Sequence, residues 1–178
     1  MGGLWGSFAN VCIYRIPQER GVVAGRSYCP QCKIKISWYD NIPILSYLII
    51  QGKCRNCKKK ISIQYLIVEL ISIISFGVVY FFYGITFTTL WFIILALTFI
   101  IIFFIDLKHY IIPNSLTFPL MFLGFIKSFD PNLNELFPNY INSLIGGVFG
   151  YGIIWAIIFS YKVLRNKEGM GLGDAKLL

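Results

Sequence analysis

The chain has 178 residues, of which 57% are hydrophobic and 13% charged, and its formal net charge is +8. Its mean hydropathy of +0.69 excludes an ordinary water-soluble domain and indicates a protein of the lipid bilayer. A basic balance can also indicate nucleic-acid binding, but the basic cytoplasmic loops of membrane proteins already account for it. We therefore expect an all-α, polytopic (multi-pass) membrane protein with no nucleic-acid partner.

The first third of the chain contains a short apolar block and a long basic loop. Residues 1–14 are apolar but fall short of the ~20 residues that cross a bilayer, so we predict a partial first transmembrane helix. Residues 15–60 hold 10 of the 16 Lys and Arg. Positive charge concentrates in cytoplasmic loops, so this loop is predicted to be cytoplasmic. Its brief apolar patch over 42–50 is predicted to be packed or interfacial.

Residues 61–178 alternate apolar blocks with polar breaks and are predicted to form one transmembrane region. The expected helices cover 61–83, 85–105, 115–129 and 140–163. The polar breaks at 106–114 and 162–174 are predicted on the cytoplasmic side. The break at 130–139 carries acids and no Lys or Arg, which places it on the opposite side. The predicted fold is thus a helix bundle with one inserted cytoplasmic loop.

Four of the five cysteines form two Cys-x-x-Cys pairs in the basic loop: Cys29, Cys32, Cys54 and Cys57. In a reducing compartment, paired cysteines favour metal ligation over disulfides. Four thiolates suit a tetrahedral, structural zinc ion, which would fold a loop that has little apolar core. Free reduced thiols or regulatory disulfides are the alternative.

Two carboxylates are predicted to meet at the cytoplasmic face. Asp106 follows an inward-going helix, and Asp174 follows a basic loop and opens the next helix. Such a pair suits aspartic proteolysis, with one carboxylate as general base on water and the other, protonated, as general acid. Alternatively, Asp106 is a solvated loop acid and Asp174 an N-cap.

Four further residues are candidates for supporting this site. Glu69 lies inside an apolar helix and needs a polar partner, either in the active cavity or on another helix. Gly171 and Gly173 lack a Cβ and would let their loop place Asp174 tightly. Lys176 would tune Asp174 or anchor the chain at the cytoplasmic face.

These features, in this order along the chain, resemble the type IV prepilin peptidases, which are GxGD aspartic proteases. The resemblance rests on residues 6–17 (Gly-Ser-Phe-Ala-Asn-Val-Cys-Ile-Tyr-Arg-Ile-Pro), the two Cys-x-x-Cys pairs, Asp-Asn-Ile-Pro at 40–43, Asp106 with Ile-Pro-Asn at 112–114, and Gly-Leu-Gly-Asp-Ala-Lys at 171–176. The GxGD motif joined to an upstream aspartate at the membrane edge is its most specific part.

The resemblance implies an activity, a location and a site. The activity is cleavage of the leader from type IV prepilins or pseudopilins, for pili or protein secretion. The location is the cytoplasmic face of the bacterial inner (plasma) membrane, and Asp106 and Asp174 stand at the family's catalytic positions. Bifunctional members also N-methylate the new amino terminus with S-adenosylmethionine, and the cysteine loop is associated with those members. From the residues alone, no methyl-donor site is identified.

The sequence departs from the family's pattern at its ends. The family usually has a longer first helix and further helices after GxGD, so we expect a chain truncated at the C-terminus. Two other functions remain open from the residues. One is a small transporter or membrane scaffold in which intramembrane acids such as Glu69 carry protons or cations. The other is a non-catalytic assembly subunit with the same fold.

Overall fold

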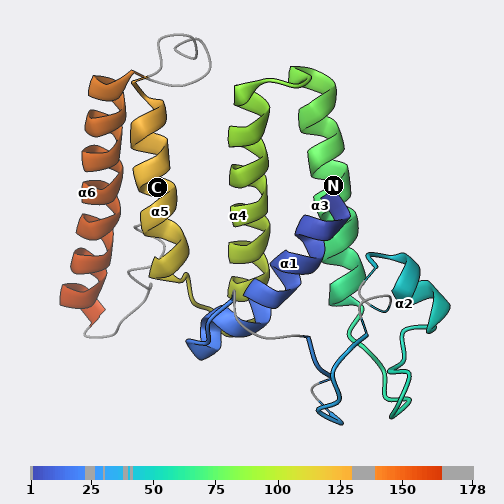
Figure 1. The fold of residues 1–178 in the computed structure, drawn as a ribbon. Coiled ribbons are helices and arrows are strands. Elements are labelled where there is room, and N and C mark those ends of the chain that lie inside the picture. The colour runs from blue at the N-terminus through green and yellow to red at the C-terminus, as the bar shows by residue number, and fades with distance from the viewer. Residues whose placement is uncertain are drawn as a thin grey trace. The chain divides into compact units, whose positions relative to one another are not determined.

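The computed structural model describes residues 2–22, 27–29, 31–37, 40, 42–129 and 139–165. Within these residues the fold is helical (Figure 1). Extended pairing there is confined to the isolated bridges Tyr28–Lys35 and Lys53–Lys60. The helices are α1 (Gly2–Arg15), the 3-10 turn η1 (Ile16–Gln18), α2 (Leu45–Ile49), α3 (Gln64–Tyr83), α4 (Phe87–His109), α5 (Asn114–Lys127) and α6 (Tyr140–Arg165). The prediction of an all-α fold is confirmed.

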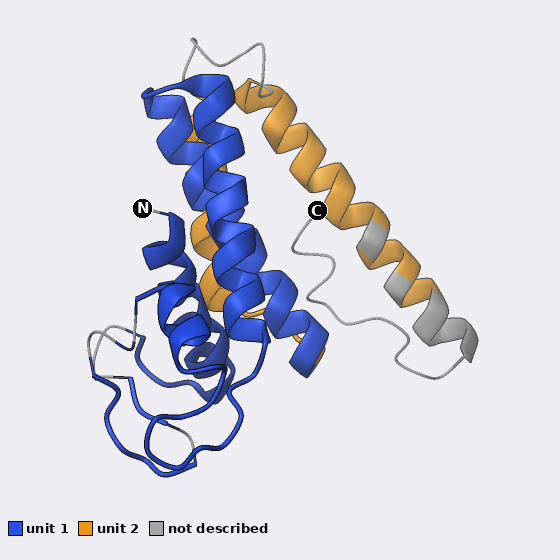
Figure 2. Ribbon diagram, turned by 90° about the vertical axis from the view of Figure 1, so that its right-hand side faces the viewer, with its two compact units in different colours: residues 1–109 blue, residues 110–178 orange. Residues whose placement is uncertain are grey.

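The chain divides into two compact units, Met1–His109 and Tyr110–Leu178 (Figure 2). Unit 1 holds α1 to α4 and the cysteine loop, and unit 2 holds α5 and α6. In unit 1, α3 and α4 form an antiparallel hairpin, and α1 packs against both of them. The short helix α1, whose length alone would not cross a bilayer, is therefore fixed by its neighbours.

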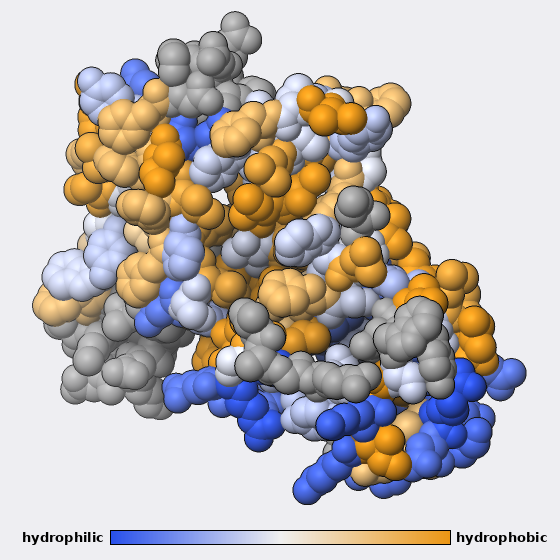
Figure 3. All heavy atoms as spheres, viewed as in Figure 1, coloured by the Kyte–Doolittle hydropathy of each residue, from blue (hydrophilic) through white to orange (hydrophobic). Residues whose placement is uncertain are grey.

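Three helices in the described part of the chain are long and apolar enough to cross a membrane. They are Gln64–Tyr83, Phe87–His109 and the segment Tyr140–Ile157 of α6. Their large apolar side chains are widely exposed, for example Phe81 at 82% and Ile74 at 62%. Figure 3 shows apolar side chains gathered over the helices and hydrophilic ones at the loop end of unit 1. Such extensive apolar exposure is expected of surface that faces lipid.

Helix α4 is longer than the sequence predicts. The expected helix ends at Ile105, but the structure continues it by about a turn to His109. No helix breaker occurs before Pro113, and Lys108 and His109 complement the negative end of the helix dipole. The helix ends at His109, and the next residue, Tyr110, has a left-handed φ of 54°. Asp106 thus lies within the last turn of α4 rather than in the break after it.

Glycine lets α1 approach α3 at backbone distance. A Cβ on Gly6 would lie 2.8 Å from Cα of Glu69, and one on Gly2 would lie 2.9 Å from Cα of Ile73. On the same two helices, Ala9 of α1 and Val68 of α3 are fully buried. Small residues four apart are a common means of close helix packing in membranes. The contact therefore depends on the absence of side chains at these positions.

A methyl group at Gly6 should loosen this contact. We expect Gly6→Ala to lower the free energy of unfolding by about 1–3 kcal/mol, because the backbone of α3 must move away. Gly77→Ala, in the middle of α3 and with nothing within 4 Å of its Cβ, is the matched control and should cause no loss. Thermal unfolding in one detergent measures both variants. Equal behaviour of the two would show that the α1–α3 approach is not tight.

Candidate functional site

The first Cys-x-x-Cys pair is built as a tight backbone knuckle. The N–H of Cys29 donates to the carbonyl of Ile34 at 3.0 Å, and the N–H of Lys33 donates to the carbonyl of Cys29 at 2.8 Å. Lys33 turns the chain with a left-handed φ of 58°. These bonds hold both thiols of the pair on one side of a turn.

The second pair repeats the same construction 25 residues later, from Cys29 to Cys54. The N–H of Cys54 donates to the carbonyl of Lys59 at 2.9 Å, and the N–H of Lys58 donates to the carbonyl of Cys54, also at 2.9 Å. Lys58 has a φ of 57°, which matches its counterpart in the first knuckle. The loop is therefore two equivalent metal-ligand turns facing each other.

The two knuckles bring all four thiols together. Their sulfur atoms lie within 4.8 Å of one another. Sulfurs from opposite knuckles are 3.9 Å apart for Cys29 and Cys57, and 4.0 Å apart for Cys32 and Cys54. Tetrahedral zinc with Zn–S bonds of 2.3 Å needs sulfurs about 3.8 Å apart, whereas a disulfide needs about 2.05 Å. The four free cysteines thus form a cluster that can hold a metal ion.

The thiols of the cluster differ in their pKa. Hydrogen bonds from the backbone of Cys57 and of Asn56 lower the pKa of the Cys54 thiol to about 7. For Cys57, the backbone of Lys59 lowers the pKa, but desolvation and the neighbouring thiols outweigh it and raise the pKa to about 11. Metal ligands must be thiolates, so metal binding at this cluster would displace protons, including the one that the raised pKa retains on Cys57.

Glu69, the buried acid of α3, has protein partners on two other segments. Its Oε1 accepts a hydrogen bond from Ser7 Oγ of α1 at 2.5 Å. Its Oε2 accepts one from the backbone N–H of Ile44, just before α2, at 2.8 Å. A second link between α1 and α3 runs from Asn10 Nδ2 to the carbonyl of Tyr65 at 3.1 Å. Two roles were considered for Glu69: supporting the active cavity, or bonding to another helix. The structure provides partners for the second role.

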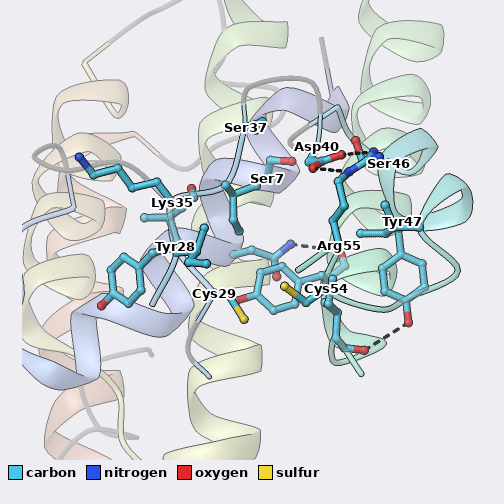
Figure 4. Close-up of a pocket in the computed structure, with 18 of the residues that line it drawn as sticks. Ser7, Tyr28, Cys29, Lys35, Ser37, Asp40, Ser46, Tyr47, Cys54 and Arg55 are labelled. Carbon is cyan, nitrogen blue, oxygen red and sulfur yellow. Dashed lines mark hydrogen bonds and ion pairs between the residues drawn. The ribbon is translucent and has the colours of Figure 1, made fainter. Parts of the chain in front are cut away.

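A cavity of about 650 Å³ lies between α1, the two knuckles, α2 and the start of α3 (Figure 4). Arg55 and Asp40 form a bidentate ion pair in its wall, with Nη2–Oδ1 at 2.8 Å and Nε–Oδ2 at 3.0 Å. Two cluster cysteines, Cys29 and Cys54, also line the cavity, so the metal centre and the cavity share a wall. Sequence reasoning missed the ion pair, although Asp40 stands in one of the quoted motifs.

The structure places one of the two predicted catalytic aspartates. Asp106 is exposed in the last turn of α4, at the end of unit 1 that carries the cysteine loop (Figure 1). Asp174 lies outside the described residues, and so do its predicted supports Gly171, Gly173 and Lys176.

Comparisons with known proteins cover almost the whole chain. The profile described as "Bacterial Peptidase A24 N-terminal domain" matches residues 1–83, and that of the "Type IV leader peptidase family" matches residues 92–178. The chain is similar to three proteins named prepilin leader peptidase/N-methyltransferase. The Neisseria gonorrhoeae protein is 38% identical over 100% of this chain and 69% of its own length. The Vibrio cholerae protein is 40% identical over 97% and 70%, and the Pseudomonas aeruginosa protein 34% over 100% and 68%. No solved structure matches the chain.

Proposed function

The chain belongs to the type IV leader peptidase family, and we propose that it removes the leader peptide from type IV prepilins or pseudopilins. The observation that carries this proposal is the similarity at 33–40% identity to relatives named prepilin leader peptidase/N-methyltransferase, over nearly the full chain. The exposed acid at the membrane edge of α4 agrees with proteolysis at that edge.

Asp106 and Asp174 are the proposed catalytic pair. In this mechanism one ionised carboxylate takes a proton from water, which attacks the carbonyl carbon of the scissile peptide bond. The other carboxyl is protonated and donates its proton to the carbonyl oxygen as it becomes tetrahedral. Two close carboxylates resist ionising together, which keeps one in each state. The support is the position of Asp106 in the last turn of α4 and the Gly-Leu-Gly-Asp motif that ends at Asp174.

The four cysteines are proposed to hold a structural zinc ion. The donor set fits zinc because all four ligands are thiols at near-tetrahedral spacing. Four protein ligands leave no open position for substrate, so the ion stabilises the loop and takes no part in peptide cleavage.

A second reaction, N-methylation of the new amino terminus with S-adenosylmethionine, is proposed from the relatives' names. The two activities suit one enzyme, because the amine that accepts the methyl group exists only after the leader is cut.

The proposed location is the bacterial inner membrane, with the cysteine loop and the aspartates at the cytoplasmic face. Ten Lys and Arg within 15–60 support this orientation. Helix α2 supports a position of the loop against the membrane surface, because Leu45, Leu48 and Ile49 are 57%, 60% and 72% exposed. The bilayer interface is the environment in which such a face is stable.

A labelling experiment tests this topology. We expect an impermeant thiol reagent to label Asn134→Cys in intact cells, and to label Arg20→Cys only after the membrane is permeabilised. Both residues lie in segments assigned by charge, one without Lys or Arg and one rich in them. The unsubstituted chain gives the background of the native cysteines. The reverse pattern would overturn the proposed orientation and the meeting of the two aspartates.

Cleavage of a precursor tests the function itself. Membranes that contain this chain should shorten a pilin-like precursor at the junction after its basic leader, as mass spectrometry of the product would show. Serine and cysteine protease inhibitors should not slow the reaction, because neither nucleophile takes part. A chain that conducts ions in a Glu69-dependent manner and leaves every such precursor intact would be the transporter instead.

A further inference from the structure

Two largely buried carboxylates, Asp40 and Glu69, line the cavity, and they differ in their charge partners. Asp40 forms the bidentate ion pair with Arg55. Glu69 is 8% exposed and, among the residues that the structure describes, has hydrogen bonds but no ion pair. A buried carboxylate without a counter-ion is costly, so its presence in the wall of a cavity indicates a place where a cation binds.

The two hydrogen bonds of Glu69 orient its carboxylate and leave it free acceptor capacity. Ser7 Oγ donates to one oxygen and the N–H of Ile44 to the other. A carboxylate can accept about four hydrogen bonds. Both donors are neutral, so they fix the position of the group without cancelling its charge. Ser7 and Glu69 both line the cavity, and Figure 4 shows Ser7 in its wall.

Glu69 lies at the same end of unit 1 as Asp106 (Figure 1). Helices α3 and α4 are antiparallel neighbours, Glu69 is the sixth residue of α3, and Asp106 is the fourth from the end of α4. At the rise of an α-helix, each residue lies within about 8 Å of this end of its helix. Cleavage at Asp106 would create a new α-amino group at this end, and such a group is largely charged at neutral pH.

We propose that Glu69 binds the α-ammonium group of the cleaved substrate and is a catalytic residue of the N-methylation proposed above, on which this inference rests. An ammonium group has three donors, which suits the unused acceptor sites of this carboxylate. Leu4, Phe8 and Val11 of α1 also line the cavity, so apolar surface for the first side chain of the mature substrate lies beside the charged group.

The bound α-ammonium must lose a proton before it can accept a methyl group. One of its N–H bonds breaks, and the carboxylate of Glu69 takes the proton. The freed lone pair of the amine attacks the methyl carbon of S-adenosylmethionine, forming an N–C bond while the C–S bond breaks and the sulfur keeps the electron pair. The product is a secondary ammonium, and Glu69 then gives its proton to water.

Binding of two synthetic peptides to the purified, zinc-loaded chain without methyl donor tests the site. Both have the sequence that follows the cut in the precursor, but one has a free α-amino group and the other an acetylated one. Wild-type protein should bind the free peptide at least about tenfold more tightly, because only this peptide carries the charge. Glu69→Gln should bind both alike, since glutamine keeps the size of the side chain and an acceptor for Ile44 but has no charge.

A buried hydroxyl on the same helix provides the matched control. Ser72 of α3 is fully buried and bonds within its own helix, and it does not line the cavity. Ser72→Ala should therefore keep the preference for the free peptide. Zinc content and thermal unfolding show whether each variant is folded. In membranes, the ratio of methylated to cleaved product should fall at least about tenfold in Glu69→Gln and stay unchanged in Ser72→Ala.

The outcomes separate this inference from the function on which it rests. Equal binding of the two peptides by wild-type protein, or a preference that persists in Glu69→Gln, would overturn the ammonium site. A preference that depends on Glu69, in a protein that cleaves its precursor but never methylates the product, would support the ammonium site and contradict the methyltransferase.

Discussion

Precursor cleavage should fall by about 10²–10⁴-fold in each of the variants Asp106→Asn and Asp174→Asn. Asparagine keeps the size of aspartate and some of its hydrogen bonds, but it cannot take a proton from water or give one to the carbonyl oxygen. Neither carboxyl completes the cycle alone, so the double variant should be hardly worse than either single one. Quantified product from membranes with matched levels of each variant measures the losses.

An aspartate outside the proposed pair provides the control for these variants. Asp130→Asn changes an acid in the break predicted on the opposite side of the membrane, and it should leave cleavage near normal. Asp106→Glu adds a further test, because one extra methylene displaces the carboxyl and misplacement on that scale can cost about a hundredfold. Near-normal processing by either Asp→Asn variant of the pair would remove the dyad from the mechanism.

The two glycines before Asp174 should be needed for the same reason. In the proposed site, the absence of a Cβ at Gly171 and Gly173 would allow their loop to bring Asp174 close to Asp106 and still leave room for an extended substrate. The exposure of Asp106 in the last turn of α4 agrees with a carboxyl that must meet both water and a partner from elsewhere in the chain.

The helices could be predicted from sequence because each is encoded by a contiguous run of apolar residues. The predicted helix over 61–83 compares with Gln64–Tyr83, and that over 140–163 with Tyr140–Arg165. The predicted end of α4 was wrong because the first polar residue, Asp106, was taken as the first residue after the helix. Polarity marks the edge of the membrane, whereas a helix ends only where its backbone is broken, here at Tyr110.

The metal cluster was predictable and the cavity was not. A Cys-x-x-Cys pair places two ligands on one turn by local geometry, so four sulfurs within 4.8 Å follow from the sequence spacing once the two turns meet. The partners of Glu69 are of another kind, since Ser7 lies 62 residues away and Ile44 contributes only a backbone N–H. The spacing of apolar residues along the sequence does not predict such contacts. It does not predict the ion pair of Asp40 with Arg55 either.

Loss of the metal should unfold the cysteine loop without removing the protein from the membrane. We expect one zinc per chain and none in Cys54→Ser, which removes one of the four proposed ligands. Few apolar side chains are buried among the described residues of the loop, so its fold should depend on the ion. The apparent free energy of zinc binding in zinc-finger peptides is about 10–16 kcal/mol. Cys12→Ala, outside the cluster, should keep its zinc. Metal analysis and the rate of thiol alkylation measure both effects.

The same experiment has a pH dependence with a definite sign. Each ligand must lose its proton, so zinc affinity should fall as the pH falls, and the loss should become steeper below the pKa of Cys54, about 7, where that thiol is protonated as well. Native protein without stoichiometric metal, whose four loop thiols alkylate rapidly at neutral pH, would refute the zinc centre. Such thiols would be free, and the two knuckles would then have to be held by their backbone hydrogen bonds alone.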